Sequence, residues 1–496
     1  MTNMERSAGV LLHVSSLPNK YGIGSLGKGA IEFIDFLAKN NFSFWQTLPI
    51  CPNGDGYSPY QSQSTNAYNH LFIDIDELIE KGLLFDSETE NLQKVSLDNT
   101  VNYEQVEIEK KKLLRLAYSR FNREDEKFIK FKKDKKIKEY AIFKAMKKLD
   151  QRVFTAWGTL TKKELLEFEE KYSSEIDYFI FLCYEFTLEW QKIKKYANKK
   201  GISLIGDVPI YVAYDSADVC FNTDIFALDH NREMVSVAGV PPDYFSSTGQ
   251  LWGNPLYNWK CDGVYKWWTD RVKRAFSMFD YVRVDHFRAF ADYYSIKNGS
   301  ENAIFGEWIE GPNMKLFNYL KEKKVSQNFI AEDLGTIDDR VRNLLRETGF
   351  PGMKVAIFGY DGNPYNEHLP CNYPENSVAY TGTHDNNTLC GFLSTISENA
   401  KEIVERLTRH SLAVQNIEGD FSSDKELALK IIECVLSSRS NLAIIPMQDI
   451  LLLGEEARMN TPSTVGGNNW RFRIKSSDYE NENISLIKSM IQKYNR

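Results

Sequence analysis

Eight short apolar runs, each bounded by turn-forming residues, constrain the fold of this chain more than any other feature. They cover residues 9–15, 44–50, 203–212, 281–287, 328–334, 352–358, 378–384 and 442–451. Many of them are followed by segments with the apolar spacing of a helix, and this alternation predicts βα units around a parallel sheet. Eight units are the number that a closed (β/α)8 barrel requires, although an open doubly wound sheet could hold the same strands.

The carboxyl ends of the runs favour the barrel over the open sheet. Most of the runs finish in polar or ionisable residues, which are Gln46, Asp207, Asp285, Glu332, His384 and Asp449. Barrel enzymes place their chemistry at this end of the strands. We therefore predict an α/β fold of the (β/α)8 TIM-barrel type, in which residues 1–496 form a single catalytic barrel.

Two regions interrupt the alternation of strands and helices. Residues 76–200 are rich in Lys, Glu and Leu with helical periodicity, and they predict a mainly helical insertion. Residues 239–259 hold three prolines, three glycines and several aromatic residues without a clear period. A long irregular loop inside a compact domain is usually functional, so we predict a lid-like loop over the active site.

Composition excludes several classes of protein. No stretch approaches the about 18 consecutive apolar residues of a membrane helix, and the amino terminus lacks the pattern of an export signal. The net charge of −7 argues against a nucleic-acid surface. The seven cysteines occur singly, which is typical of reduced thiols. We expect a cytoplasmic protein without a nucleic-acid or membrane partner.

Neither a metal nor a nucleotide cofactor is expected. The seven histidines are dispersed and no HExxH motif occurs. The stretch GIGSLG at 22–27 matches the GxGxxG fingerprint of dinucleotide-binding proteins. The next apolar run, however, lacks the acidic end that would bind the ribose. The match therefore carries little weight.

The run YVRVDHF at 281–287 ends in the first set of candidate catalytic residues. In an extended strand Arg283 and Asp285 share a face, roughly 6 to 7 Å apart. The guanidinium would keep the carboxylate ionised in an apolar barrel end. Asp285 could then act as a nucleophile, or the pair could simply brace the barrel. The two residues alone leave both interpretations open.

A second candidate site is FIAEDLGT at 329–336. Its adjacent carboxylates, Glu332 and Asp333, disfavour double ionisation, which is one way to keep a carboxylic acid protonated near neutral pH. A proton donor is one interpretation. The other is the start of a helix, with Thr336 as its cap and with Asp338 and Asp339 at the positive end of its dipole.

A third set of polar residues follows an apolar strand in YTGTHDNNT, which contains His384, Asp385, Asn386 and Asn387. Three carboxylates on three strand ends, with aromatic residues nearby, fit glycoside chemistry. Retaining enzymes use one carboxylate as nucleophile and a second as acid/base, about 5 to 5.5 Å apart. A third can bind sugar hydroxyls more strongly in the transition state.

Several motifs together resemble the 4-α-glucanotransferase family, also called amylomaltase or disproportionating enzyme. They are DGYSPYQSQSTNAYN, GDVPIYVAYDSADVC, GVPPDYFSSTGQLWGNPLY, RVDHFRAF, AEDLG, YTGTHDNNT and STVGGNNWRFR. The resemblance covers nearly the whole chain. It implies a (β/α)8 barrel with inserted, largely helical subdomains and no carboxy-terminal β-domain. It also implies that Asp285 is the nucleophile, Glu332 rather than Asp333 the acid/base, and Asp385 the stabiliser of the transition state.

The resemblance further implies a set of sugar-binding residues. Those at the cleavage point are Arg283, His286 and His384; those in a glucan-contacting loop are Tyr57, Ser58 and Tyr60; those in the lid-like loop are Asp243, Gln250 and Trp252; and Asp361 and Asn468 complete the set. The expected activity is the transfer of α-1,4-glucan segments between maltooligosaccharides by a retaining double displacement. The alternatives are an α-glucan hydrolase of the amylase type and a glucan-binding barrel without catalysis.

Overall fold

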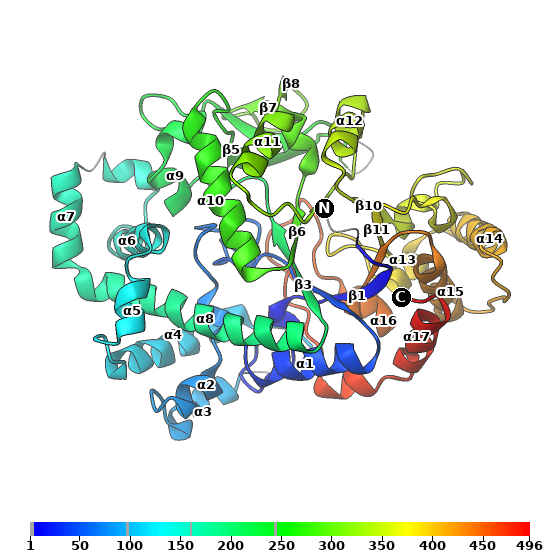
Figure 1. Cartoon of the computed structure of the whole chain (residues 1–496), viewed down its shortest axis with the longest axis horizontal. Coiled ribbons are helices and arrows are strands. Elements are labelled where there is room, and N and C mark those ends of the chain that lie inside the picture. The colour runs from blue at the N-terminus through cyan, green and yellow to red at the C-terminus, as the bar shows by residue number, and fades with distance from the viewer. Residues whose placement is uncertain (1–3, 96–98, 159–160, 243–245) are drawn as a thin grey trace.

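Eight parallel strands close into a barrel in the computed structural model, which describes residues 4–95, 99–158, 161–242 and 246–496 (Figure 1). The barrel strands are β1 (Ser7–Leu11), β2 (Phe44–Gln46), β3 (Ser203–Val208), β6 (Tyr281–Val284), β9 (Phe329–Ala331), β10 (Gly352–Val355), β11 (Ser377–Tyr380) and β12 (Leu442–Pro446). Their order around the barrel is β1-β12-β11-β10-β9-β6-β3-β2. Each of the eight predicted runs overlaps one of these strands, so the predicted (β/α)8 barrel is confirmed.

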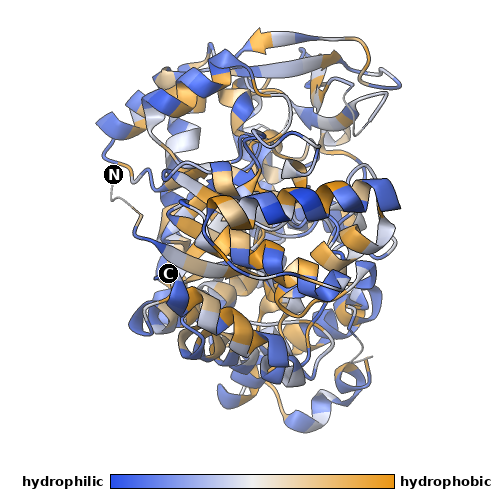
Figure 2. Cartoon of the chain, turned by 90° about the vertical axis from the view of Figure 1, so that its right-hand side faces the viewer, coloured by the Kyte–Doolittle hydropathy of each residue, from blue (hydrophilic) through white to orange (hydrophobic). Residues whose placement is uncertain are grey.

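Helices surround the barrel because the strands are buried on both faces and need a cover. Hydrophobic residues gather in the middle of the molecule, whereas hydrophilic residues lie mainly on the outer helices (Figure 2). The helices that follow or precede the barrel strands are α1 (Lys28–Lys39), α8 (Ser173–Lys199), α10 (Asp262–Met278), α11 (Met314–Glu322), α12 (Asp339–Thr348), α13 (Leu389–Thr395), α14 (Glu398–Val414), α15 (Asp424–Ser437), α16 (Met447–Ile450) and α17 (Glu482–Lys493).

The segment between β2 and β3 is helical, with α8 as its last element. The other helices are α2 (Ile75–Glu80), α3 (Glu90–Gln93), α4 (Tyr103–Arg120), α5 (Glu126–Phe131), α6 (Lys135–Leu149) and α7 (Lys162–Lys171), and the short α9 (Ala217–Cys220) follows β3. Most of these helices begin where a side-chain oxygen accepts a backbone N–H of the first turn; Asn102, Asp125, Asp134 and Thr161 do so. That residues 76–200 form an insertion separate from the barrel stays a prediction.

A second, smaller sheet lies beside the barrel and was not predicted. Its antiparallel strands are β4 (Ser236–Val240), β5 (Gln250–Pro255), β7 (Asp292–Lys297) and β8 (Gly306–Glu310), in the order β5-β4-β7-β8. Part of the predicted lid-like loop at 239–259 is therefore strand β5, paired with β4. Strand β7 begins just after the β6 end, so this sheet is connected directly to the candidate nucleophile.

The glycine-rich stretch at 22–27 has a packing role. A Cβ atom on Gly27 would lie 2.2 Å from the carboxyl group of Asp74. That carboxylate accepts from the Ser25 hydroxyl at 2.5 Å and from the backbone N–H of Glu77 at 3.0 Å, which caps α2. The glycine thus lets the start of α1 approach the cap of α2, a reason for glycine that involves no cofactor.

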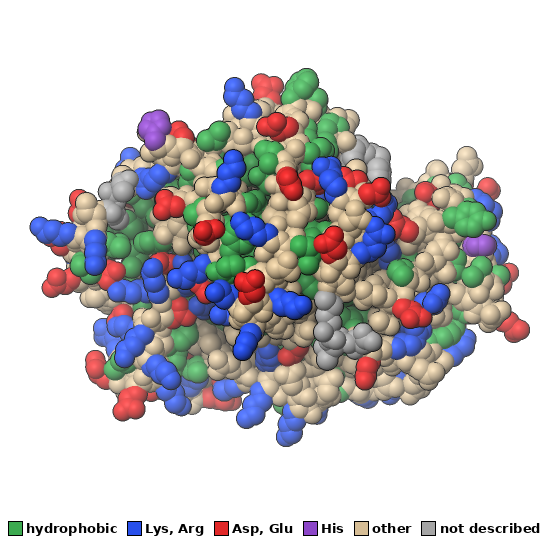
Figure 3. Space-filling model, turned by 45° about the horizontal axis from the view of Figure 1, so that its top comes forward, with side chains coloured by type: hydrophobic (Ala, Val, Ile, Leu, Met, Phe, Trp, Pro, Cys, Tyr) green, Lys and Arg blue, Asp and Glu red, His purple; other side chains and the backbone are tan. Residues whose placement is uncertain are grey.

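The surface carries charges of both signs. In the face seen in Figure 3, Lys and Arg side chains are interspersed with Asp and Glu side chains. No helix among the described residues is both long enough and apolar enough to span a membrane.

Candidate active site

The ends of strands β3 and β6 position a buried ion-pair bridge. Their register places Asp207 beside Arg283. The Arg283 guanidinium, of which 4% is exposed, lies 2.7 Å from Asp207 Oδ2 and 2.9 Å from Asp285 Oδ1. The expected pair of Arg283 and Asp285 therefore forms, with Asp207 as an additional partner. Asp285 keeps 29% of its side chain exposed, so one face of its carboxylate stays accessible to a ligand.

His286 lies two residues after the end of strand β6 and turns the chain. Its backbone is left-handed, with φ of 50° and ψ of 51°, a conformation that non-glycine residues adopt at a cost. The turn aims the His286 N–H at Glu332 Oε2, 2.6 Å away, and packs the ring edge-on against Trp252 with centroids 4.7 Å apart. Burial lowers the pKa of His286 to about 4, so the ring is neutral at pH 7. Its Nε2 atom is buried without a hydrogen-bond partner in the described structure.

Glu332 follows strand β9 and is almost fully buried. Burial first, and the charge of Asp285 second, raise the pKa of Glu332 to about 8. The backbone N–H groups of His286 and Leu334 donate to its two oxygens at 2.6 and 3.0 Å. The side chain is therefore a carboxylic acid at neutral pH, fixed in place on both sides. A buried group of this kind can donate a proton.

The adjacent Asp333 was predicted from the sequence as the carboxylate that keeps Glu332 protonated, and this prediction was wrong. Asp333 turns away from Glu332, accepts the backbone N–H of Met353 at 2.6 Å and lies 4.0 Å from Lys354. Consecutive residues at a strand end face opposite sides, which is why Asp333 points away from Glu332. The carboxylate whose charge raises the pKa of Glu332 is Asp285.

The expected cap of the following helix was also wrong. Asp338, rather than Thr336, caps α12, because its side chain accepts the N–H groups of Arg340 and Val341.

Asp385 follows strand β11 and is the most exposed of the three candidate carboxylates, at 44% of its side chain. Its Oδ1 accepts from Asn460 Nδ2 at 2.6 Å, and its backbone oxygen accepts from the Arg458 guanidinium at 2.8 Å. His384 Nε2 lies 3.4 Å from its other oxygen. Asn460 and Arg458 were not predicted; they lie just before the STVGGNNWRFR motif, which was the available signal.

An aromatic wall stands next to these carboxylates. The Tyr60 ring stacks on His384 with centroids 5.0 Å apart and planes 13° apart, and Trp470 tilts against both rings at 5.7 and 5.9 Å. The Tyr60 hydroxyl donates to Asp207 at 2.8 Å. Burial, and then the charge of Asp207, raise the pKa of Tyr60 well above its usual range, so it remains a donor. Flat apolar faces edged by hydroxyl and imidazole groups suit a sugar ring.

Four other predicted binding residues lie in two places. Gln250 and Trp252 lie on β5, where the Trp252 indole N–H donates to Gln250 Oε1 at 3.1 Å. The Tyr57 ring stacks on Tyr103 at 4.5 Å, and the Ser58 hydroxyl accepts the N–H of Tyr60 at 3.3 Å.

Two predicted residues are not brought to the centre by any described contact. The Asp361 carboxylate accepts the nearby N–H of Asn363 at 2.8 Å, and Asn468 is exposed. Asp243 lies outside the described residues.

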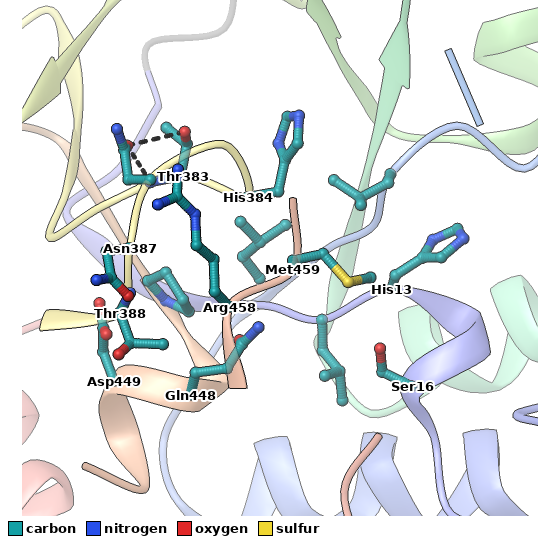
Figure 4. A pocket seen from close by; sticks show the side chains of 15 residues that line it. His13, Ser16, Thr383, His384, Asn387, Thr388, Gln448, Asp449, Arg458 and Met459 are labelled. Atoms are coloured by element: carbon teal, nitrogen blue, oxygen red, sulfur yellow. Dashed lines mark hydrogen bonds between the residues drawn. The ribbon is translucent and has the colours of Figure 1, made fainter. Parts of the chain in front are cut away.

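A small pocket adjoins His384 (Figure 4). The loop after β11, the end of β12 and residues 458–459 supply its walls, with Arg458 extending toward Thr383. His13 lines the opposite side; burial, and then the proximity of His384, lower its pKa to about 3. Among the described residues, no group of three or more His, Cys, Asp and Glu side chains is placed to hold a metal ion.

A (β/α)8 barrel with acidic side chains on neighbouring strand ends and an aromatic wall defines a barrel enzyme of the glycosidic-bond class. The family model described as 4-alpha-glucanotransferase matches residues 12–478. The chain belongs to this 4-alpha-glucanotransferase family.

Named relatives support this membership along the whole chain. The chain is 43% identical to a 4-alpha-glucanotransferase of Clostridium butyricum, over 98% of this chain and 100% of the relative. It is 40% identical to the chloroplastic/amyloplastic enzyme of Solanum tuberosum, over 96% and 83% of the two chains. An amylomaltase from Streptococcus agalactiae, solved in complex with acarbose, superposes with a TM-score of 0.92 at 35% identity, over 99% and 100% of the two chains.

Proposed function

We propose that this protein transfers segments of α-1,4-glucan between maltooligosaccharides by a retaining double displacement. The observation that carries the proposal is the contrast between two carboxyl groups that share one site. Asp285 is ion-paired with Arg283 and accessible, whereas Glu332 is buried with a pKa raised to about 8. A retaining mechanism requires one accessible carboxyl group that attacks and a second carboxyl group that donates a proton.

In the first step Asp285 attacks the anomeric carbon of the donor glucan while Glu332 protonates the leaving glycosidic oxygen. The bond from the anomeric carbon to that oxygen breaks, and a covalent glycosyl-enzyme forms. Glu332, now a carboxylate, then takes the proton from the 4-hydroxyl of an acceptor sugar, whose oxygen displaces Asp285. Asp385 binds hydroxyl groups of the reacting sugar, and its own orientation is supported by Asn460.

A transferase must favour a sugar over water as acceptor. The contact between Trp252 of β5 and His286 supports a role for residues 239–259 as a lid, because it places an apolar ring beside the candidate nucleophile. Arg283, His286, His384, Tyr60 and the residues of β5 are proposed to hold the donor sugar. The buried, unpartnered Nε2 of His286 is suited to accept or donate one sugar hydroxyl bond.

We further propose that the protein acts in the cytoplasm, without a metal or organic cofactor. The seven cysteines occur singly in the sequence, which is typical of proteins of a reducing compartment. No step of the mechanism above needs a group that the side chains do not supply.

Incubation with maltotriose separates transfer from hydrolysis. A transferase should release glucose together with maltodextrins longer than maltotriose. An amylase-type hydrolase would yield only shorter sugars, and a glucan-binding barrel would leave maltotriose unchanged. Chromatography of the products over time distinguishes the three outcomes, and either of the last two would contradict the proposal.

A further inference from the structure

Arg288 lies three residues after Asp285 and has no role in the mechanism above. It belongs to the short turn Phe287–Phe290 that follows β6, and its side chain is 5% exposed. Its guanidinium donates to the backbone oxygen of Thr336 and, at 3.1 Å, to Asp338 Oδ2. The loop after the candidate nucleophile is therefore tied to the loop after the candidate acid.

The same guanidinium also contacts the small sheet. It lies 2.8 Å from Oδ1 of Asp292, the first residue of β7, and its central carbon lies 3.8 Å from the centroid of the Trp308 ring in β8. These two strands belong to the sheet whose strand β5 carries Gln250 and Trp252. One buried side chain thus joins the nucleophile loop, the acid loop and the sheet that faces the sugar site.

Arg340 is a second cation beside Asp292 and Asp338, on the solvent side of this cluster. Its guanidinium lies 2.5 Å from Asp292 Oδ2 and 2.9 Å from Asp338 Oδ2, and 60% of its side chain is exposed. It binds the same two aspartates as Arg288, but it belongs to α12, and its described contacts do not include the nucleophile loop. Arg340 is therefore a matched control for the loss of a cation from this cluster.

We propose that Arg288 is a positioning residue that holds Glu332 against Asp285 and keeps strand β5 aligned with both. Glu332 is fixed by the N–H of His286 on one side and the N–H of Leu334 on the other. His286 precedes the Arg288 turn, and Leu334 precedes the Thr336 carbonyl that Arg288 binds. The planar, five-donor fork of arginine can engage a carbonyl and two carboxylates together, whereas a lysine ammonium cannot match that geometry. This inference rests on the proposed function, because it assigns Glu332 the role of acid.

The direction in which the pKa of Glu332 shifts when Arg288 is replaced separates a positioning role from a direct electrostatic role. The charged groups that act on Glu332 are Asp285 and Arg283, and His286 next to it is neutral. If Arg288 no longer holds the two loops together, water reaches Glu332 and Asp285 moves away from it, so the pKa of Glu332 falls. Removal of a nearby positive charge without movement would instead raise that pKa.

The test compares Arg288→Lys, Arg288→Ala and Arg340→Ala with the wild type. Three quantities are measured: the thermal midpoint, the pH dependence of kcat/KM on maltotriose, and the infrared band of protonated carboxyl groups. The infrared band is taken as the difference between each protein and its Glu332→Gln counterpart, so that it reports the titration of Glu332 without turnover. Arg288→Lys keeps the charge and guards against a variant that fails to fold.

We expect the titration of Glu332 and the high-pH limb of kcat/KM to move down by about one pH unit or more in both Arg288 variants. The limb should stay in place in Arg340→Ala. Unchanged titration in folded Arg288→Lys, or an upward shift in Arg288→Ala, would overturn the proposal. A wild type that does not convert maltotriose would contradict the proposed function, and the infrared titration would still decide the role of Arg288.

Discussion

The raised pKa of Glu332 should destabilise the folded protein at neutral pH. Replacing Glu332 by a residue that does not titrate should therefore raise the free energy of unfolding. The unfolded glutamate titrates at about 4.5 and the folded one at about 8. Below pH 4.5 the group is protonated in both states and costs nothing. As the pH rises from 4.5 to 8, the unfolded state gains stability by ionising while the folded state cannot, so folding stability falls by about 1.4 kcal/mol per pH unit.

Glu332→Gln removes this titration. Relative to the wild type, the variant should gain about 2.5 kcal/mol of unfolding free energy between pH 5 and pH 7. A constant loss opposes this gain, because glutamine can accept only one of the two backbone N–H bonds, which costs about 1 to 2 kcal/mol. Counted from the low-pH limit, the gain reaches about 3.4 kcal/mol at pH 7, so after this loss we expect the variant to be more stable than the wild type by about 2 kcal/mol.

Urea unfolding of both proteins at half-unit intervals from pH 5 to pH 8 measures this difference. Asp333→Asn is the control, because burial raises the pKa of Asp333 only to about 6. Its difference from the wild type should stop changing above pH 6, whereas the Glu332→Gln difference should keep growing until about pH 8. A Glu332→Gln difference that is independent of pH would refute the account of a protonated Glu332.

Three further predictions concern activity and packing. Glu332→Gln should abolish transfer from maltotriose but spare a first-turnover burst of fluoride from maltosyl fluoride, whose leaving group needs no proton; equal loss of leaving-group release from both donors would count against the acid role. Trp470 has a φ of 67°, so Trp470→Gly should be more stable than Trp470→Ala by about 1 kcal/mol in thermal unfolding, and the reverse order would contradict strain at this position. Gly27→Ala should lose about 2 kcal/mol in the same assay through the clash with Asp74, and an unchanged midpoint would show that the turn can adapt.

The barrel could be predicted because each of its strands is a short apolar run with a polar end. Burial on both faces removes the polar residues from such strands, so the runs stand out from their flanks. The small sheet could not be predicted in the same way. Strands β5 and β8 are partly exposed, and β5, with the pattern QLWGNP, lies within a proline- and glycine-rich stretch.

The candidate site could be located from the strand ends, but its internal geometry could not. The pair of Arg283 and Asp285 follows from alternation along one strand. The influence of Asp285 on Glu332 depends on two strands that are neighbours in the barrel and whose paired residues, such as Val282 and Phe329, are 47 positions apart in the chain. The partners of Asp385 come from residues 458–460, beyond the last barrel strand, and the nearby STVGGNNWRFR motif was the only signal that pointed to this segment.

The central claim is that Asp285 forms a covalent bond with the donor sugar, and trapping tests it most directly. Glu332→Gln incubated with maltotriosyl fluoride blocked at its terminal 4-hydroxyl should accumulate the intermediate, because the variant lacks the base that activates an acceptor. Intact mass followed by peptide mapping should place one added maltotriosyl group on the peptide that contains Asp285. An adduct on Asp385 or Asp333, or fluoride release without any adduct at all time points, would contradict the account.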